Sequence, residues 1–294
     1  MKWENIRNVL AAVGAFVLIM LTLALLITAI SGKDRFALHD KVAVMEIQGI
    51  ILDPADITQE IRDLSERDDV KAVVVRIDSP GGAVGPSQEI YSEILRLKQK
   101  KTVVASMGSI AASGGFYAAV AASKIVANPG TITGSIGVII EFMNAEELLN
   151  KIGLKGYVIK SGRYKDAGSP LRKMEKDEKD LLQGVIDDVN GQFIRAVAAG
   201  RNMKEEDVAK IADGRIFSGA QAMERGLVDR LGDLTDAINL SAELAGIKGK
   251  PYVIYPDRKA LGLWRTLFGE SINKNITELF SGLRIMYLTP KPDR

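Results

Sequence analysis

From residue 41 onward, short runs of apolar and β-branched residues alternate with segments of helical periodicity. This alternation is typical of an α/β layered domain, in which helices cover a sheet whose strands are largely buried. The expected strands are 42–51, 70–77, 102–106, 124–127, 136–142 and 157–160, and the expected helices are 57–66, 86–100, 113–122, 175–199 and 203–212. We therefore predict a mostly parallel sheet with helices packed on it.

The amino-terminal segment 9–30 is apolar apart from Thr22 and Thr28. It exceeds the roughly 20 residues that a helix needs to cross a bilayer core. A cleavable signal peptide is the alternative, but its apolar stretch usually runs only about 7 to 15 residues and ends in small residues. We therefore expect a retained transmembrane helix, followed by a polar linker to residue 40, with the amino terminus inside and the body outside.

The chain contains no cysteine and a single histidine, His39. The missing thiols exclude cysteine nucleophiles, thiolate metal sites and disulfides. Because His39 lies in the polar linker, a Ser-His-Asp triad or a histidine-based zinc site is not expected either. The net charge is only +2, and basic residues are not interleaved with aromatic ones, so we expect no nucleic-acid partner.

Three glycine-rich turns follow or interrupt the expected strands, at 78–82, 106–117 and 131–137. In an open α/β sheet this is where the ligand crevice lies. In the first turn, Pro80 fixes one backbone dihedral, and Gly81 and Gly82 leave room for backbone N–H groups to approach a bound carbonyl. The third turn is expected to form a wall of the same site, although each turn taken alone is an ordinary connection.

Ser113 lies in the second turn, at the start of an expected helix. A serine in this position is usually an N-cap. Here, however, Ala111, Ala112, Gly114 and Gly115 leave space beside the hydroxyl for a substrate backbone. The unpaired N–H groups at the helix start, including that of Gly114, are suited to stabilise an oxyanion. These features make Ser113 the candidate nucleophile.

A lysine is the remaining candidate for a general base, and Ser-Lys pairs are a known variant of the catalytic triad. A free lysine has a pKa of about 10.4, so a lysine base must be desolvated to be neutral near working pH. Lys165 follows the expected strand 157–160, lies between Gly162 and Gly168, and is preceded by Tyr164. It is the candidate base.

The ordered motifs resemble those of the signal peptide peptidase A family, whose members belong to the Clp protease/crotonase superfamily. The resemblance covers about residues 41–247 and this chain has one copy of the catalytic unit, as in short forms of the family. The motifs that carry it are 78–82, 108–117 with Ser113 as nucleophile, 133–138, 161–166 with Lys165 as base, 214–222 and 226–229.

The resemblance implies a membrane-anchored serine endopeptidase that needs no cofactor or metal. It implies that Gly82 and Gly114 donate to the oxyanion and that Ser135 positions the Lys165 amine. It further implies a homo-oligomeric ring or dome, peptide substrates bound as extended strands, and clearance of cleaved signal peptides at the outer face of a bacterial inner membrane. Whether Ser113 and Lys165 of one site come from the same chain is left open.

Two other functions remain possible at this point: a crotonase-like enzyme acting on acyl-CoA, and a non-catalytic membrane scaffold. The predicted organisation is an anchor and linker (1–40), a Ser/Lys peptidase domain (41–247) and an amphipathic tail (248–294). In the tail, apolar residues recur at helical spacing from Trp264 to Leu283, and this stripe is expected to pack on protein or lie on the membrane. The charged segment 171–180 is expected to be a solvated helix face.

Overall fold

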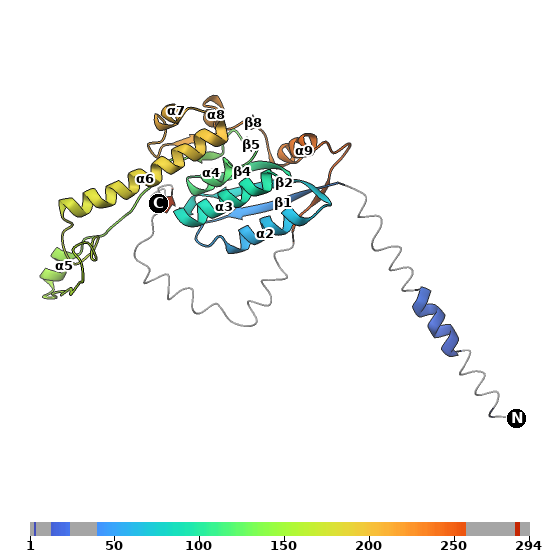
Figure 1. The fold of residues 1–294 in the computed structure, drawn as a ribbon, viewed down its shortest axis with the longest axis horizontal. Helices are drawn as coiled ribbons and strands as arrows, with labels where there is room; N and C mark the ends of the chain where they lie inside the picture. The colour runs from blue at the N-terminus through green and yellow to red at the C-terminus, as the bar shows by residue number, and fades with distance from the viewer. Residues whose placement is uncertain (1–2, 4–12, 24–39, 257–285, 289–294) are drawn as a thin grey trace.

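The computed structural model describes residues 3, 13–23, 40–256 and 286–288, and Figure 1 shows its fold. Eight strands form the main sheet, in which neighbouring strands are parallel except for the pair β6 and β7. From one edge the strands are β7 (Ile216–Ser218), β6 (Ile132–Gly134), β4 (Thr102–Ala112), β2 (Val70–Ser79), β1 (Lys41–Gln48) and β9 (Tyr252–Ile254). A branch from β4 adds β5 (Lys124–Ala127) and β8 (Arg230–Leu231). The predicted α/β fold with a mostly parallel sheet is confirmed.

Helices bury both faces of the central strands, as the apolar runs require. The larger core lies between one face and the helices α2 (Ala55–Glu66), α3 (Val84–Lys98), α4 (Gly114–Ala119) and α6 (Lys176–Arg201). The other face is covered by α9 (Leu234–Leu244), which packs on alternate residues of β1 and β2. Two short helices, α7 (Glu205–Ala209) and α8 (Gly219–Glu224), complete the body. The layers hold the carboxyl ends of β2 and β4 in fixed register.

Three predicted elements differ from the structure. The strand expected at 102–106 continues as β4 to Ala112, because Asp78 Oδ1 accepts a hydrogen bond from the Ile110 N–H at 3.1 Å and the strand then pairs with β6. The strand β6 lies within the segment expected to be a turn. The strands expected at 136–142 and 157–160 are absent from the described structure, because this part of the chain leaves the sheet.

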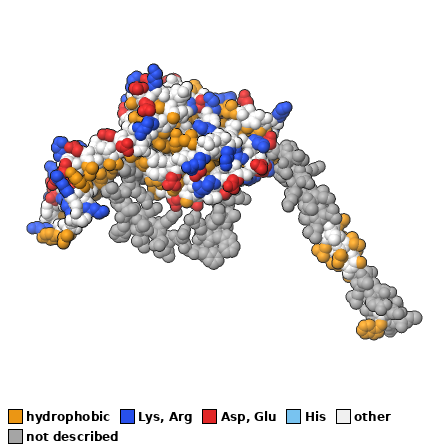
Figure 2. All heavy atoms as spheres, in the orientation of Figure 1, with side chains coloured by type: hydrophobic (Ala, Val, Ile, Leu, Met, Phe, Trp, Pro, Cys, Tyr) orange, Lys and Arg blue, Asp and Glu red, His pale blue; other side chains and the backbone are white. Residues whose placement is uncertain are grey.

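Residues 137–177 form what we call the arm, and none of them is buried. Its helix α5 (Glu146–Lys151) lies with the amino-terminal end of α6 at a tip that projects from the body (Figure 1). Apolar side chains gather on the surface of this projecting end (Figure 2), among them Met143, Tyr157 and Ile159, which are 81%, 87% and 103% exposed. The apolar periodicity that predicted buried strands here thus belongs to an exposed surface.

Both chain ends are described only in part. Of the predicted anchor, residues 13–23 are helical and the others lie outside the described residues. Among the described helices, none combines the length and apolar character needed to cross a membrane. The apolar stripe predicted from Trp264 to Leu283 also lies outside the described residues. Nearer the body, β9 adds a strand of the predicted tail to the main sheet, and β10 (Met286–Leu288) pairs antiparallel with β3 (Gly81–Ala83).

Candidate active site

Ser113 links the end of β4 to the start of α4 in an unusual backbone conformation. Its φ is 55° and its ψ is −119°, outside the regions that residues with a side chain normally occupy. Holding such a conformation costs about 1–3 kcal/mol. The surrounding structure fixes it, because the Ser113 N–H donates to the Gly134 carbonyl and the Ser113 carbonyl accepts from the Tyr117 N–H, both at 2.8 Å.

The Ser113 hydroxyl is buried and has no hydrogen-bond partner among the described residues. It stands at the N-cap position of α4 but makes no capping hydrogen bond, so the usual structural role of a serine at a helix start does not apply. A buried polar atom left without a partner costs about 1–3 kcal/mol and calls for an explanation. A hydroxyl that pairs with a substrate or a general base during a reaction would account for it.

Two glycines bring backbone atoms close to Ser113. A Cβ placed on Gly114 would lie 3.3 Å from the Gly82 nitrogen and 2.4 Å from Ser87 Oγ. A Cβ on Gly82 would lie only 2.0 Å from the Ile51 carbonyl oxygen. Only glycine fits at either position without rearrangement. The two predicted oxyanion donors, Gly82 and Gly114, therefore lie beside each other at the nucleophile.

The segment that carries Ser135 packs against the same strand end. Thr131 and Thr133 each donate a side-chain hydrogen bond of 2.7 Å to carbonyls of β4, those of Gly108 and Ala111. Ser135 itself is 4% exposed, has a φ of 50°, and donates its N–H to a carbonyl of the segment before β7. The third glycine-rich turn thus packs next to Ser113.

Asp78 is a residue whose role the sequence did not reveal. Its hydrogen bond to the Ile110 N–H ties the end of β2 to the extension of β4. At this point the register slips, since Ile77 pairs with Met107 but Ser79 pairs with Ala111. The slip lets β4 continue to Ser113. An acidic residue at the end of an apolar strand was the only signal of this brace.

Lys165 does not lie with these residues in the single chain. It is an exposed residue of the arm, and its side chain has no hydrogen-bond or ion-pair partner among the residues described. The loop around it is attached to Glu178 near the start of α6, whereas Phe193, further along α6, packs against Tyr117 of α4 with ring centroids 4.9 Å apart. The 15 helical steps from Glu178 to Phe193 span roughly 22 Å. One chain therefore supplies the nucleophile and its surroundings, but not the predicted base.

An extended segment lies along the other side of the nucleophile site. The strand β10 pairs with β3 so that Tyr287 is opposite Gly82 and Leu288 is opposite Gly81. The β3 edge that contains a predicted oxyanion donor can therefore accept an extended chain in antiparallel orientation.

Comparisons with known proteins connect this geometry to a family. The sequence profile of Peptidase family S49 matches residues 95–248, just over half of the chain, and the Clp protease profile matches residues 38–131. The chain belongs to peptidase family S49. It is a serine peptidase of the signal peptide peptidase A type, within the Clp protease/crotonase superfamily. This decides against the acyl-CoA and scaffold alternatives.

Several members of the family are closely similar in sequence. A protein of Synechocystis sp. named as a protease is 50% identical over 209 residues, which are 70% of this chain and 75% of that protein. An Enterococcus faecium protein named as signal peptide peptidase SppA is 35% identical over 220 residues, 70% of this chain and 64% of that protein. The chloroplastic serine protease SPPA of Arabidopsis thaliana is 32% identical over 271 residues, 84% of this chain and 40% of that protein.

Proposed function

We propose that this S49 peptidase is a membrane-anchored endopeptidase that uses a Ser113/Lys165 dyad to hydrolyse extended peptides, cleaved signal peptides among them. The observation that carries the proposal is the buried, unpartnered Ser113 hydroxyl, held in a strained turn between two glycine-rich segments. Strain at one residue and an unsatisfied buried hydroxyl at the same residue are both typical of a reaction centre rather than of packing.

In the proposed mechanism, Ser113 Oγ attacks the scissile carbonyl carbon while the neutral Lys165 amine takes the hydroxyl proton. The Gly82 and Gly114 N–H groups stabilise the resulting oxyanion, a contribution of about 10²–10³ in rate for one such donor. The Lys165 ammonium then protonates the leaving amine and frees the first product. A water molecule, deprotonated by the same amine, releases the acyl group from Ser113, and Ser135 positions the amine throughout.

The proposed base comes from a neighbouring copy of the chain. Within one chain the arm places Lys165 away from Ser113, and no residue of the arm is buried. A projecting segment with exposed apolar side chains is suited to pack against another subunit. In a closed homo-oligomer such as a ring or dome, each arm would deliver its lysine to the next subunit and bury it there, which favours the neutral amine.

The substrate is proposed to bind as an extended strand along β3. The pairing of β10 with this edge supports this mode, since it brings an extended chain opposite Gly82. Binding through backbone hydrogen bonds is tolerant of side-chain sequence, which suits the clearance of peptides of varied composition. The apolar segment 9–30 supports an inner-membrane anchor, with the peptidase body on the extracytoplasmic side.

The test is hydrolysis of a peptide reporter by purified full-length protein in detergent. Ser113→Ala and Lys165→Ala are each expected to lower kcat by at least about 10⁴-fold, because nucleophile and base act as a unit. Lys179→Ala, at another exposed lysine near the arm, is the matched control and keeps wild-type activity. Normal turnover in either of the first two variants, with the assembly intact, contradicts the dyad.

A further inference from the structure

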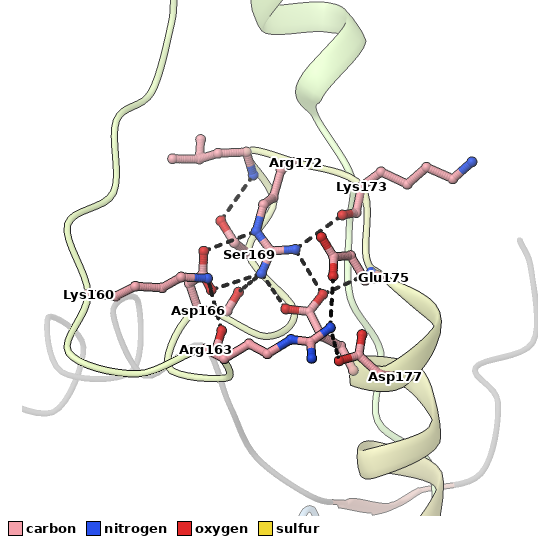
Figure 3. A network of polar contacts seen from close by, with 10 residues as sticks. Lys160, Arg163, Asp166, Ser169, Arg172, Lys173, Glu175 and Asp177 are labelled. Atoms are coloured by element: carbon pink, nitrogen blue, oxygen red, sulfur yellow. Dashed lines mark hydrogen bonds and ion pairs between the residues drawn. The ribbon is translucent and has the colours of Figure 1, made fainter.

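The loop that carries Lys165 is fastened to α6 by a cluster of charged side chains centred on Arg172 (Figure 3). Asp166 Oδ1 accepts from Arg172 Nη2 at 2.8 Å, and Asp166 Oδ2 accepts from Arg172 Nε at 3.0 Å. The Lys160 ammonium also donates to Asp166 Oδ1. Both oxygens of the Asp166 carboxylate are therefore bound.

The same guanidinium binds a second carboxylate on α6. Arg172 Nη1 donates to Glu178 Oε2 at 2.8 Å, and Arg172 Nη2 donates to Glu178 Oε1. Glu178 Oε2 also accepts from the Glu175 N–H at 2.9 Å, which closes the capping box of α6. Arg172 thus joins the residue after Lys165 to the first turn of the helix. The sequence predicted a solvated face for 171–180, but the Glu178 side chain is only 3% exposed.

Nearly all of the charged groups around Asp166 are paired within this cluster. The hydrogen bonds from Arg172 hold the pKa of Asp166 well below its usual range and lower the pKa of Glu178 to about 2. The charged groups that surround Asp166 in the cluster are Lys160, Arg163, Arg172, Glu175, Asp177 and Glu178, with Arg163 paired to Asp177 and Glu175. Lys165, the residue before Asp166, has no side-chain partner among the described residues.

The pairing of Asp166 with Arg172 bears on the protonation state of Lys165, which must be neutral in the proposed dyad. A carboxylate next to an amine favours the protonated form of the amine, and a protonated amine cannot act as a base. Asp166 directly follows Lys165 in the chain, so an unbound Asp166 side chain would be the nearest counter-ion for it. The planar guanidinium of Arg172 meets two carboxylates with paired hydrogen bonds, a geometry that a lysine at this position would not reproduce.

We infer that Arg172 is a positioning residue of the peptidase: it holds the Asp166 carboxylate on the α6 side of the loop, so that Lys165 is presented to the neighbouring subunit without a counter-ion. The inference rests on the proposed Ser113/Lys165 dyad. It assigns to Arg172 an effect on the protonation of the base as well as on the shape of the arm.

The test is the pH dependence of kcat/KM for full-length protein in detergent, measured with a peptide reporter. Arg172→Met is expected to move the acidic limb of the profile upward by about one pH unit, because Asp166 is released toward Lys165. Adding Asp166→Asn to Arg172→Met is expected to return the limb to its wild-type position. Arg172→Lys retains the positive charge, and the limb should stay closer to wild type than in Arg172→Met.

Two further variants keep the inference falsifiable even if Arg172→Met fails to assemble. Asp166→Asn alone leaves no carboxylate to pair with Lys165, so its limb should not move upward. Arg201→Met removes an ion-paired arginine on the body, where Arg201 Nη1 binds Asp229 Oδ2 at 2.8 Å and the side chain is 7% exposed against 29% for Arg172, and should also leave the limb in place. An upward shift in either variant, or an unmoved limb in Arg172→Met, overturns the inference.

The same assay separates this inference from the proposed function. If Lys165→Ala retains turnover, the dyad itself is wrong. If Lys165→Ala is inactive and the limb of an assembled Arg172→Met enzyme coincides with that of the wild type, only the role of Arg172 is wrong. Size-exclusion chromatography of each variant confirms that the profiles compare equal assemblies.

Discussion

The part of the body that carries Ser113 and the arm that carries Lys165 are stabilised by different kinds of interaction. Ser113 lies in the body, where it is fully buried and fixed by the sheet, by α4 and by hydrogen bonds to neighbouring turns. Lys165 lies on the arm, in which no residue is buried and the loop is fastened by ion pairs. The body is therefore complete by itself, whereas the arm has the character of a segment that becomes buried against another subunit.

In the proposed composite site, assembly would also regulate activity. An isolated chain would have a formed nucleophile site and no general base. Association of two chains would add the base and bury it in the same step, so that activity depends on protein concentration.

The largest effect is expected from Gly82→Ala in the body. The added methyl group would lie 2.0 Å from the Ile51 carbonyl oxygen, so β3 must move. The N–H of residue 82 would then leave the position proposed for binding the oxyanion. We expect kcat to fall by about 10²–10³-fold, measured with the peptide reporter. Gly85→Ala is the matched control, because nothing lies within 4 Å of its added Cβ and the residue is in α3. That variant should keep its activity; equal losses in both would disprove the assignment of Gly82.

A smaller effect is expected from placing a charge on the arm, as in Ile159→Asp. Ile159 is fully exposed in one chain, so the substitution should leave the fold of the body unchanged. If the arm packs against a neighbour, a buried carboxylate there costs about 2 kcal/mol or more. We expect the assembly to dissociate in size-exclusion chromatography and activity to fall about tenfold or more.

Leu244→Asp, on the body, is the control for this experiment. Leu244 is 47% exposed at the end of α9, away from the arm. The assembly should persist in this variant. An Ile159→Asp enzyme that keeps both its size and its activity would show that the arm does not form the contact.

The smallest effect concerns the pH dependence of stability where the arm joins α6. The pKa of Glu178 is lowered to about 2 by Arg172, so its contribution to stability is fully present above the ordinary carboxyl pKa and is lost as pH falls toward about 2. Glu178→Gln should therefore lower the melting temperature modestly near neutral pH, and the difference from wild type should shrink between about pH 4 and 2. Asp180→Asn, on the exposed side of the same helix, is the control. A difference that does not depend on pH would contradict the ion-pair explanation.

The sequence predicted the body much better than the arm. Apolar β-branched runs identified β1, β2 and β5 because their burial on both faces leaves a clear pattern, and the small residues around Ser113 identified the turn at the nucleophile. Ile136 is buried in the core, but Ile139 and the apolar residues at 157–159 carry the same pattern and are exposed, since an exposed apolar surface and a buried strand share one composition. The approach of Gly82 to Gly114 depended on a register slip at Asp78 that no local pattern records.

The position of Lys165 could be predicted in sequence but not in space. Its motif marked it as the candidate base, yet its distance from Ser113 depends on the direction of α6 and, in the proposed assembly, on the neighbouring chain. Arg172 was missed for a related reason, because a segment of alternating charge usually forms a solvated helix face. Only the folded loop shows that its guanidinium binds Asp166 and Glu178 together.

The most direct test of the account is to mix two inactive variants, Ser113→Ala and Lys165→Ala, and let their subunits exchange. If each site combines Ser113 of one chain with Lys165 of its neighbour, a random equal mixture restores about a quarter of the wild-type activity, since half of the sites have an intact serine and half of those have an intact lysine. If the mixture exchanges subunits and stays inactive, the two residues act within one chain, and the composite site proposed here is wrong.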